Sequence, residues 1–412
     1  MMLMDSKQSE MIIGTLGHVD HGKTTLTRAL TGVWTDTHSE SVKRSMTIKL
    51  GYADVVVRHC TNASCSGTKG YTISEKCLVC GGKTEQARRI SILDAPGHET
   101  LMATAIAGSN IIDAVLFVIS AAEKCPMPQT KEHLMLINLL DIKKAIIVQT
   151  KVDVVGHDAA KEHYQQIKAF IKGSVIENAP IVPVIASKNI NIDVILQMLA
   201  EMPLPQRDVD SDPIMYAARS FDVNRPGAEI AKLNGGVVGG SIIRGRLKVG
   251  DEIEISPGIA SKNADKQKAS SYTPIRTKVE ALSASAGHLD EAIAGGLIAI
   301  GTSLDPAITK ADGLVGSIVG KAGKVPKPVI SITLSMHVME RDDVPKQGFR
   351  ENEPLILGIG TATVGGFVSA VKKNSIGVTL KRPVCIDKDS KISILRNFSQ
   401  RWRLAGYGTL AK

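Results

Sequence analysis

Aromatic residues are scarce in this 412-residue chain, at 3% of all positions, and long uncharged apolar runs are missing. The scarcity of rings argues against a nucleic-acid surface built on base stacking. The lack of any apolar run of about 18 residues argues against a membrane-spanning helix or a membrane partner. The N-terminal stretch 1–10 is short and charged, without a secretory signal, so we expect a cytoplasmic protein.

Positive charge is in modest excess, with 50 lysines and arginines against 41 acidic residues and a net charge of +9. This balance suits a polyanionic partner such as RNA, and it equally describes an ordinary basic soluble protein. A phosphate-contacting surface and solvated strand faces are both open for two basic clusters, which comprise Arg219, Arg225, Lys232, Arg244 and Arg246, and Arg396, Arg401 and Arg403.

The chain changes character along its length. Its first half alternates apolar strands with helical stretches, which predicts an α/β domain with a mainly parallel sheet. Beyond a proline-rich linker at 202–213, short strands separated by glycine and turn residues predict β-barrels, with a second linker at 321–328. We therefore expect domains at 1–205, 206–325 and 326–412.

A phosphate-binding loop is the strongest local signal. Residues 17–24 read Gly-His-Val-Asp-His-Gly-Lys-Thr, between an expected strand and an expected helix. The glycines let backbone N–H groups face phosphates, and the start of the helix adds partial positive charge. Lys23 can reach the terminal phosphates and Thr24 can bind Mg²⁺. The loop residues predicted to bind nucleotide are Asp20, His21, Gly22, Lys23, Thr24 and Thr25.

A second motif, Asp-Ala-Pro-Gly-His-Glu at 94–99, follows the apolar strand expected at 90–93. Asp94 at the strand end can hold Mg²⁺ through water. Gly97 can donate its amide to the terminal phosphate. His98 is placed to orient the attacking water: an isolated histidine is more often structural, but beside this motif we favour catalysis. The pair of motifs predicts hydrolysis of a nucleoside triphosphate.

A third motif, Thr-Lys-Val-Asp at 150–153, selects the base. The Asp153 carboxylate can accept hydrogen bonds from the ring N–H and the amino group of guanine, an arrangement that adenine does not offer. The stem of Lys151 can lie along the base plane, with Val152 between the two. Asparagine is usual where Thr150 stands, so an amide that can tie loops together is lost.

The three motifs resemble those of the translational GTPases, which include elongation factor Tu. Further stretches resemble the gamma subunit of translation initiation factor 2, in its archaeal form, and the likeness runs over nearly the whole chain. These stretches are Lys-Arg-Ser-Met-Thr-Ile-Lys-Leu-Gly-Tyr at 43–52, and residues 220–227, 235–242, 301–306 and 400–404.

This resemblance implies an α/β P-loop GTPase domain followed by two β-barrel domains. It implies GTP-dependent delivery of methionylated initiator tRNA to the small ribosomal subunit and its mRNA. It also implies a heterotrimer in which the alpha subunit docks on the second domain and the beta subunit docks on the GTPase domain.

The stretch 43–52 resembles the first switch of this family, a segment that responds to the nucleotide, and its positions acquire roles through the same resemblance. Thr47 would close on Mg²⁺ and the terminal phosphate in the GTP state, and the order of the switch depends on that phosphate. A second Mg²⁺ would be held by Asp20 and the backbone of Ser45. Ser45 stands where the family commonly has glycine, which costs energy if the site needs a positive φ angle.

The last guanine-contacting loop falls at Ile185, Ala186 and Ser187. The resemblance implies that the amide of Ala186 meets the guanine carbonyl. The family usually has serine at the position of Ile185, so this chain lacks one loop hydroxyl there.

Four of the six cysteines, Cys60, Cys65, Cys77 and Cys80, lie within the short segment 59–82. Their spacing fits a structural zinc knuckle in a loop too short to form its own core. In a cytoplasmic chain, metal is expected before disulfides. A loop with reduced thiols is the alternative, and His59 could replace Cys60 as a ligand.

Three functions are compatible with these motifs: a GTP-switched carrier of initiator tRNA, an elongation factor such as the selenocysteine-specific one, and a nucleotide-bound scaffold that hydrolyses little. The cysteine insert and the first switch favour the initiation factor, and the elongation factor is also expected to carry a further C-terminal domain. Altered loops at Thr150 and Ile185 keep the scaffold open. A comparison of tRNA affinity with GTP and with GDP separates the carrier from the scaffold.

Overall fold

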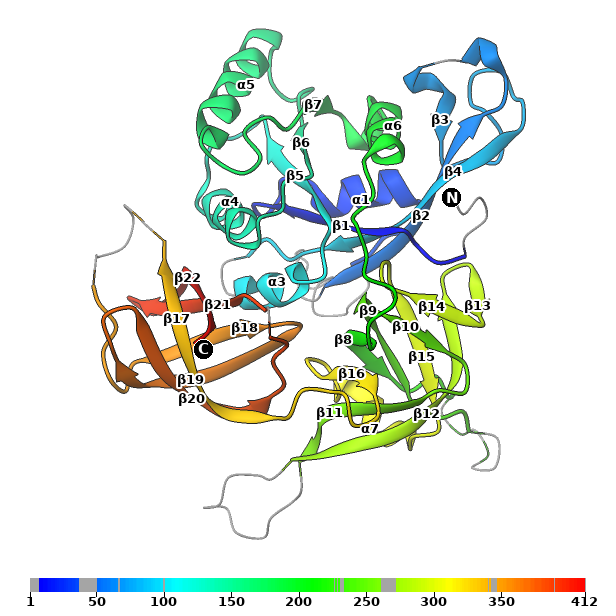
Figure 1. The fold of residues 1–412 in the computed structure, drawn as a ribbon. Helices are drawn as coiled ribbons and strands as arrows, with labels where there is room; N and C mark the ends of the chain where they lie inside the picture. Colours follow the sequence, from blue (N-terminus) through cyan, green and yellow to red (C-terminus); the bar gives the residue numbers. More distant parts are fainter. Residues whose placement is uncertain are drawn as a thin grey trace. The chain divides into compact units, whose positions relative to one another are not determined.

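The chain divides into two units, Met1–Pro205 and Gln206–Lys412. The structure is a computed structural model, shown in Figure 1. It describes residues 7–36, 50–65, 67–98, 101–225, 227, 229, 233–260, 272–339, 341, 347–388 and 390–411.

The first unit is built on a seven-stranded sheet with the order β3-β2-β4-β1-β5-β6-β7. Strands β4, β1, β5, β6 and β7 run parallel, whereas β2 and β3 add antiparallel pairs at one edge. The predicted, mainly parallel sheet is confirmed. Its strands are β1 Met11–Gly17, β2 Gly51–Cys60, β3 Tyr71–Thr72, β4 Thr84–Asp94, β5 Ala114–Ser120, β6 Ala145–Thr150 and β7 Ile181–Val184.

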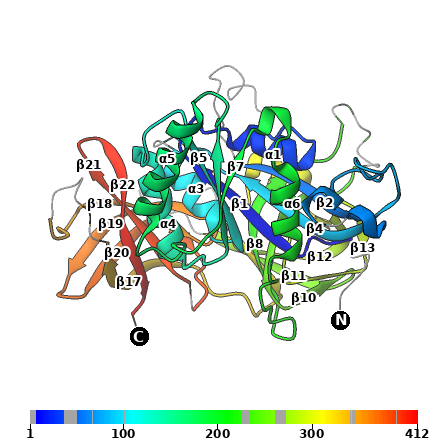
Figure 2. The same cartoon turned by 90° about the horizontal axis from the view of Figure 1, so that it is seen from above.

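Helices cover both faces of this sheet, as Figure 2 shows for α1 and α6 on one side and α3, α4 and α5 on the other. Strands β1, β5 and β6 are buried along their whole length, as expected for apolar runs sandwiched between helices. The helices are α1 Lys23–Thr31, α3 Met102–Ser109, α4 Pro128–Leu140, α5 His157–Ile171 and α6 Ile192–Glu201, with short 3-10 helices at η1 Ala63–Cys65, η2 Thr68–Gly70 and η4 Ala186–Lys188.

Alternating side chains of the central strands pack against helices on the two opposite faces of the sheet. Met11 and Ile13 join Leu26 and Leu30 of α1 and residues of α6 in one apolar cluster. On the opposite face, Phe117 of β5 lies 6.5 Å from Phe170 of α5, measured between ring centroids. This sandwich fixes the ends of β1, β4 and β6, from which the motif-bearing loops emerge.

The second unit begins with a barrel formed by β11, β16, β8, β9, β15 and β12, closed by pairing of β11 with β12. Met215, Val238 and Ile253 are among its fully buried core residues. The elements are β8 Ile214–Phe221, β9 Val237–Arg244, β10 Arg246–Lys248, β11 Glu252–Ala260, β12 Tyr272–Ala284, β13 Gly287–Leu289, β14 Glu291–Ile293, β15 Ile298–Thr302, α7 Pro306–Thr309, η6 Lys310–Asp312 and β16 Ile318–Lys321.

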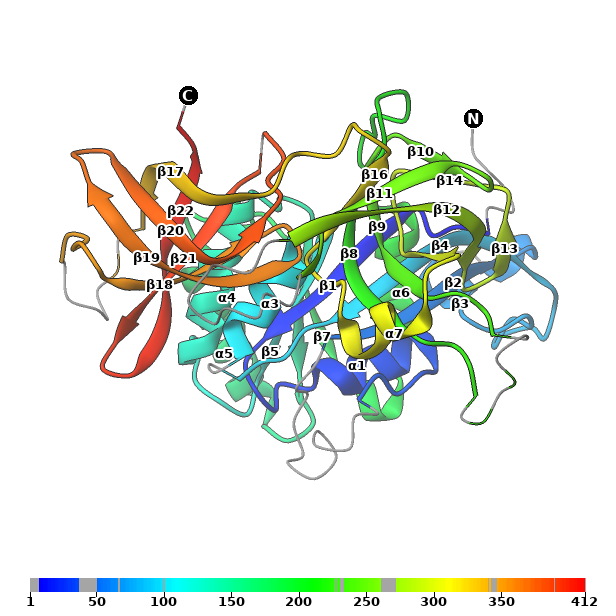
Figure 3. The ribbon, with the colours of Figure 1, turned by 90° about the horizontal axis from the view of Figure 1, so that it is seen from below.

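A second closed barrel follows in the order β17-β20-β19-β18-β21-β22, drawn in orange and red in Figure 3. Leu334, Leu357, Val378 and Ile394 fill its interior. Its strands are β17 Val329–Val338, β18 Pro354–Ile359, β19 Ala362–Val371, β20 Ser375–Val384, β21 Ile392–Phe398 and β22 Arg401–Leu410. The predicted α/β domain followed by two barrels is therefore confirmed.

Membrane insertion by a helix finds no support in the described part of the chain, where no helix combines enough length with enough apolar character to cross a bilayer.

Candidate functional site

The phosphate loop connects β1 to α1 in the way the sequence predicts. Asp20 has a φ of 59° and Gly22 a φ of 89°, so the loop turns sharply just before the first residue of the helix. That residue, Lys23, folds back, and its Nζ donates to the carbonyl oxygens of Gly17 at 3.1 Å and His18 at 2.7 Å. Burial lowers the pKa of Lys23 to about 8. An ammonium group is thus held inside the loop, where phosphate oxygens would need it.

Asp94, at the end of β4, is the second fixed point of the site. Its Oδ2 accepts hydrogen bonds from Thr24 at 2.7 Å and from Thr35 at 2.8 Å, and its Oδ1 accepts one from Thr15 at 2.8 Å. The carboxylate is fully buried. The hydroxyl and the carboxylate predicted to bind Mg²⁺ therefore meet directly. Oxygen donors of this kind are the ligands that Mg²⁺ prefers.

Gly97 lies against the phosphate loop so closely that no side chain fits. A Cβ added there would come within 2.9 Å of Gly17 O and Val19 N, and it would collide with the Lys23 ammonium. His98 follows, half-buried at the turn before α3, where its carbonyl accepts from the amide of Leu101. Motifs that are more than 70 positions apart in the chain thus converge around Lys23.

The base-reading end of the site is formed by the loops after β6 and β7. Asp153 Oδ2 accepts from Lys188 Nζ at 3.1 Å. Ile185 and Ile190 exchange backbone hydrogen bonds of 3.3 and 3.1 Å, which close the intervening loop into a tight turn. Ala186 and Ser187 lie in this turn, in the 3-10 helix that ends at Lys188.

Thr150 keeps a link that the sequence suggested would be lost. Its hydroxyl donates to the carbonyl of His21 at 2.7 Å, so the base-reading loop is tied directly to the phosphate loop. Lys151, next in the chain, has a φ of 56°. We expected that threonine in place of asparagine would leave the two loops without a side-chain link. The hydroxyl of Thr150 forms such a link in place of the amide.

Two buried histidines, His21 and His133, contribute to the packing of the phosphate loop. His21 Nδ1 lies 3.2 Å from Val118 O, and its Nε2 lies 3.5 Å from a Glu123 carboxylate oxygen. His133 of α4 accepts a hydrogen bond from the Gly17 amide at 3.0 Å. Burial lowers the pKa of both histidines to about 3, so both imidazoles are neutral at physiological pH.

Two predicted site residues, Thr25 and Val152, make no side-chain hydrogen bond in the described part of the chain. Thr25 lies in the first turn of α1 and Val152 in the turn after β6. Thr47 and Ser45 fall outside the described residues, so their predicted roles at Mg²⁺ stay predictions. Sequence reasoning missed three residues, Thr35, His133 and Lys188, because none belongs to a local motif. Their partners are distant in the chain.

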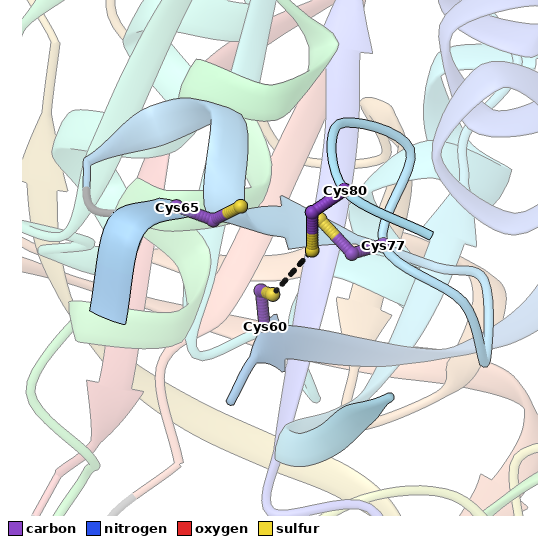
Figure 4. A group of neighbouring side chains, drawn as sticks. All are labelled: Cys60, Cys65, Cys77 and Cys80. Carbon is purple, nitrogen blue, oxygen red and sulfur yellow. Dashed lines mark hydrogen bonds between the residues drawn. The ribbon is translucent and has the colours of Figure 1, made fainter. Parts of the chain in front are cut away.

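The four cysteines of the predicted knuckle come together at the end of β2 and in the loops that precede β4, as Figure 4 shows. Their sulfur atoms all lie within 4.8 Å of one another. A tetrahedral zinc with bonds of about 2.3 Å requires sulfurs about 3.8 Å apart, so the donor set fits zinc. His59 is not part of this group: its ring packs on Tyr71, with centroids 4.8 Å apart.

Backbone N–H groups support the same cluster. The amides of Asn62 and Gly82 point at the sulfurs of Cys60 and Cys80, each at 3.4 Å. Backbone hydrogen bonds from Cys80 and Val79 lower the pKa of Cys77 to about 6. Thiolate, the form in which cysteine binds metal, is therefore favoured at Cys77, whereas the neighbouring Cys80 thiol and burial raise the pKa of Cys65 to about 12, and the pKa of Cys60 is also raised.

Four of the eight basic side chains considered for RNA contact have acidic partners within their own unit, and Lys232 lies outside the described residues. Arg219 pairs with Asp312, Arg244 with Asp387, and Arg246 with Asp210 and Glu291. Arg396 is buried and makes a bidentate pair with Glu353. These pairs favour a structural reading for the four arginines, whereas an RNA role for Arg401 and Arg403 stays a prediction.

Comparisons with known protein families agree with this geometry. Residues 8–204 match the family described as the elongation factor Tu GTP binding domain, and 235–311 match elongation factor Tu domain 2. Residues 330–410 match the C-terminal family of initiation factor eIF2 gamma.

Similar proteins named translation initiation factor 2 subunit gamma extend the match to the whole chain. The one from Methanococcus vannielii is 49% identical, over 99% of this chain and 100% of its own length. Those from Archaeoglobus fulgidus and Pyrococcus furiosus are 47% and 46% identical. They cover 97% and 98% of this chain, and 94% and 98% of their own lengths.

Solved structures share the fold. A bacterial selenocysteine-specific elongation factor EF-Sec has a TM-score of 0.72 at 24% identity, covering 97% of this chain and 58% of its own. Translation elongation factor SelB from Methanococcus maripaludis, in complex with a GTP analogue, has a TM-score of 0.72 at 21% identity, covering 99% and 80%. At this level of identity the likeness shows the fold alone.

Proposed function

Because the chain belongs to the gamma-subunit family of translation initiation factor 2, we propose that it carries methionylated initiator tRNA to the small ribosomal subunit and its mRNA. The chain is a GTP-binding subunit of an initiation factor and a GTPase. In the proposed assembly it joins alpha and beta subunits in a heterotrimer that acts in the cytoplasm. We further propose domain boundaries at 1–205, 206–325 and 326–412.

The proposed phosphate site rests on the convergence of Lys23, Thr24, Asp94 and Gly97, the single observation that best supports nucleotide binding. Lys23 would keep its bond to the carbonyl of Gly17 and donate its remaining N–H groups to phosphate oxygens, because an ammonium group has three donors. Thr24 would bind Mg²⁺ directly and Asp94 through water. Mg²⁺ would neutralise charge on the terminal phosphates.

Four further residues complete the proposed machinery. Thr47 would close on Mg²⁺ and the terminal phosphate, so that the first switch senses GTP. His98 would orient the attacking water, and the amide of Gly97 would hold the phosphate that His98 faces. A second Mg²⁺ held by Asp20 and the backbone of Ser45 stays part of the proposal.

Guanine recognition is assigned to Asp153, with Lys151 along the base and the amide of Ala186 at the guanine carbonyl. The tie from Thr150 to His21 supports this assignment, because it connects the base-reading loop to the phosphate loop. Nucleotide would therefore bridge two loops that already touch. The cysteine cluster would hold a structural zinc ion, which would pin the segment 59–82 to the sheet.

A titration of initiator tRNA against the chain with a non-hydrolysable GTP analogue, and then with GDP, tests the carrier function. Elongator methionyl-tRNA serves as the control, because it carries the same amino acid on a tRNA of different sequence. We expect tight binding only for initiator tRNA with the GTP analogue. Equal affinity for initiator tRNA in the two nucleotide states would contradict the carrier function and would favour the nucleotide-bound scaffold.

A further inference from the structure

His133 has an unusual position for a polar residue. It lies on α4, is fully buried, and sits 116 positions away from Gly17, whose amide it binds at 3.0 Å through Nδ1. The ring's other nitrogen, Nε2, is buried and finds no hydrogen-bond partner in the described part of the chain. An unsatisfied buried N–H costs free energy that leucine or phenylalanine would avoid. The hydrogen bond that Nδ1 accepts from Gly17 is therefore the interaction that accounts for a histidine at this buried position.

Hydrogen bonds and close packing constrain the backbone of Gly17. Its N–H donates to His133, its carbonyl accepts from Lys23 Nζ at 3.1 Å, and its φ of 148° suits glycine alone. A Cβ at this position would collide with the carbonyl of Val118. The N–H and C=O of Gly17 belong to the two successive peptide units that meet at its Cα, and His133 binds the first while Lys23 binds the second.

The two hydrogen bonds form a continuous chain from α4 to the lysine. His133 Nδ1 fixes the amide of Gly17, and the carbonyl of Gly17 fixes the ammonium of Lys23. Because the amide must donate, Nδ1 must be unprotonated and the proton must lie on Nε2. Burial keeps the ring neutral, since it lowers the pKa of His133 to about 3.

We propose that His133 is a positioning residue for GTP binding, which orients the phosphate-binding Lys23 through the backbone of Gly17. The proposal rests on the nucleotide site proposed above. It assigns to α4 a role that none of the three sequence motifs contains. The effect of His133 on nucleotide would pass through the backbone of Gly17, from its N–H to its C=O.

Release of a fluorescent GDP analogue from three variants tests this role. His133→Ala removes the acceptor, and we expect release about tenfold faster or more, because a buried amide loses its partner. His133→Asn places a side-chain carbonyl near the position of Nδ1 and should restore release to within about threefold of the unmodified chain. Leu136→Ala is the control, since Leu136 is also fully buried on α4. It should destabilise the fold with release unchanged.

Release at the unmodified rate in His133→Ala, or release equally fast in His133→Asn and His133→Ala, would overturn the proposal. So would a Leu136→Ala variant that speeds release as much as His133→Ala. Selectivity for guanine over adenine should stay unchanged in all three, because Asp153 is untouched. Failure of the unmodified chain to bind GDP would instead contradict the nucleotide site itself.

Nitrogen NMR of the unmodified chain covers the case in which the alanine variant does not fold. We expect His133 to carry its proton on Nε2 and to show a coupling across the hydrogen bond between Nδ1 and the Gly17 amide. A proton on Nδ1 would overturn the proposal without any substitution.

Discussion

Lys188 Nζ lies 3.1 Å from Asp153 Oδ2, so the carboxylate assigned to guanine also carries an ion pair. Both side chains reach solvent, and Lys188 is 62% exposed. In the proposed site, guanine donors would use the same carboxylate as the ammonium, which would make Lys188 a competitor for the base. The relationship joins two loops that follow different strands, β6 and β7.

Removal of the competitor should tighten nucleotide binding slightly. Lys188→Met is expected to raise GDP affinity by at most about fivefold, the upper range for an exposed ion pair. Isothermal titration with GDP measures the change, and Lys161→Met, at an exposed lysine on α5, is the control. Weaker binding in Lys188→Met would mean that the lysine helps to hold the base.

The hydroxyl of Thr150 should contribute to stability and to nucleotide retention. Thr150→Val keeps the shape but removes the donor to the carbonyl of His21, which should cost about 1 kcal/mol of unfolding free energy. Urea unfolding and GDP release rates measure the two effects. Thr150→Asn should retain a donor and behave like the unmodified chain. Identical unfolding of Thr150→Val and the unmodified chain would show that the bond contributes nothing.

Replacement of His98 separates catalysis from binding. His98→Ala should slow GTP hydrolysis about a hundredfold or more, the usual contribution of a positioned histidine, while GTP affinity persists. Single-turnover hydrolysis and equilibrium binding are the two measurements. His157→Ala, at an exposed histidine at the start of α5, is the control. Loss of GTP binding in His98→Ala would indicate a structural residue.

Zinc should be lost with any ligand of the knuckle. Cys77→Ser is expected to abolish bound zinc and to loosen the segment 59–82, because zinc replaces the core that this segment lacks. Elemental analysis and limited proteolysis report the two effects, with Cys125→Ser, outside the cluster, as control. The unmodified chain should contain one zinc per molecule, and a metal-free, folded preparation would contradict the site.

Acid should destabilise the chain partly through His133. Its pKa is lowered to about 3 in the fold by burial, and the charge of Lys23 lowers it further, against about 6.5 when unfolded. Between these values the unfolded state binds more protons, so its contribution to stability is lost as the pH falls below about 6.5. Each pH unit costs at most about 1.4 kcal/mol.

Urea unfolding at pH 7.5 and pH 5.5 measures this loss. His133→Asn does not titrate, so it should lose less stability than the unmodified chain over the same interval. Some loss should remain, because the pKa of His21 is lowered in the same direction. Equal losses in the two chains would show that His133 does not titrate as its burial requires.

Local patterns predicted much of the first unit. The strand before the phosphate loop, the helix after it and the apolar strands β5 and β6 follow from short runs whose burial is set by their own composition. Thr24 and Asp94 could also be predicted, because each belongs to a short motif whose residue types indicate Mg²⁺ binding. The four cysteines were also found from spacing, because zinc chemistry restricts that spacing.

Long-range pairings were beyond the sequence. Nothing near His133 indicates that Gly17 is its partner, and nothing near Thr35 indicates that Asp94 accepts its hydrogen bond. For the arginines of the first barrel the sequence left two readings open, an RNA surface and solvated strand faces, and it did not indicate the acidic partners of Arg219, Arg244 and Arg246. Such pairs depend on how strands and helices pack, which residue type alone does not determine.

Closure of the second barrel has a consequence for how partners can attach. A ring from β17 through β22 offers no outer strand whose backbone could pair with an incoming chain. Recognition on that barrel must therefore use loops and side chains, which can be exchanged without disturbing the ring. The sheet of the first unit ends at β7, where Pro183 interrupts the row of donors and discourages accidental strand addition.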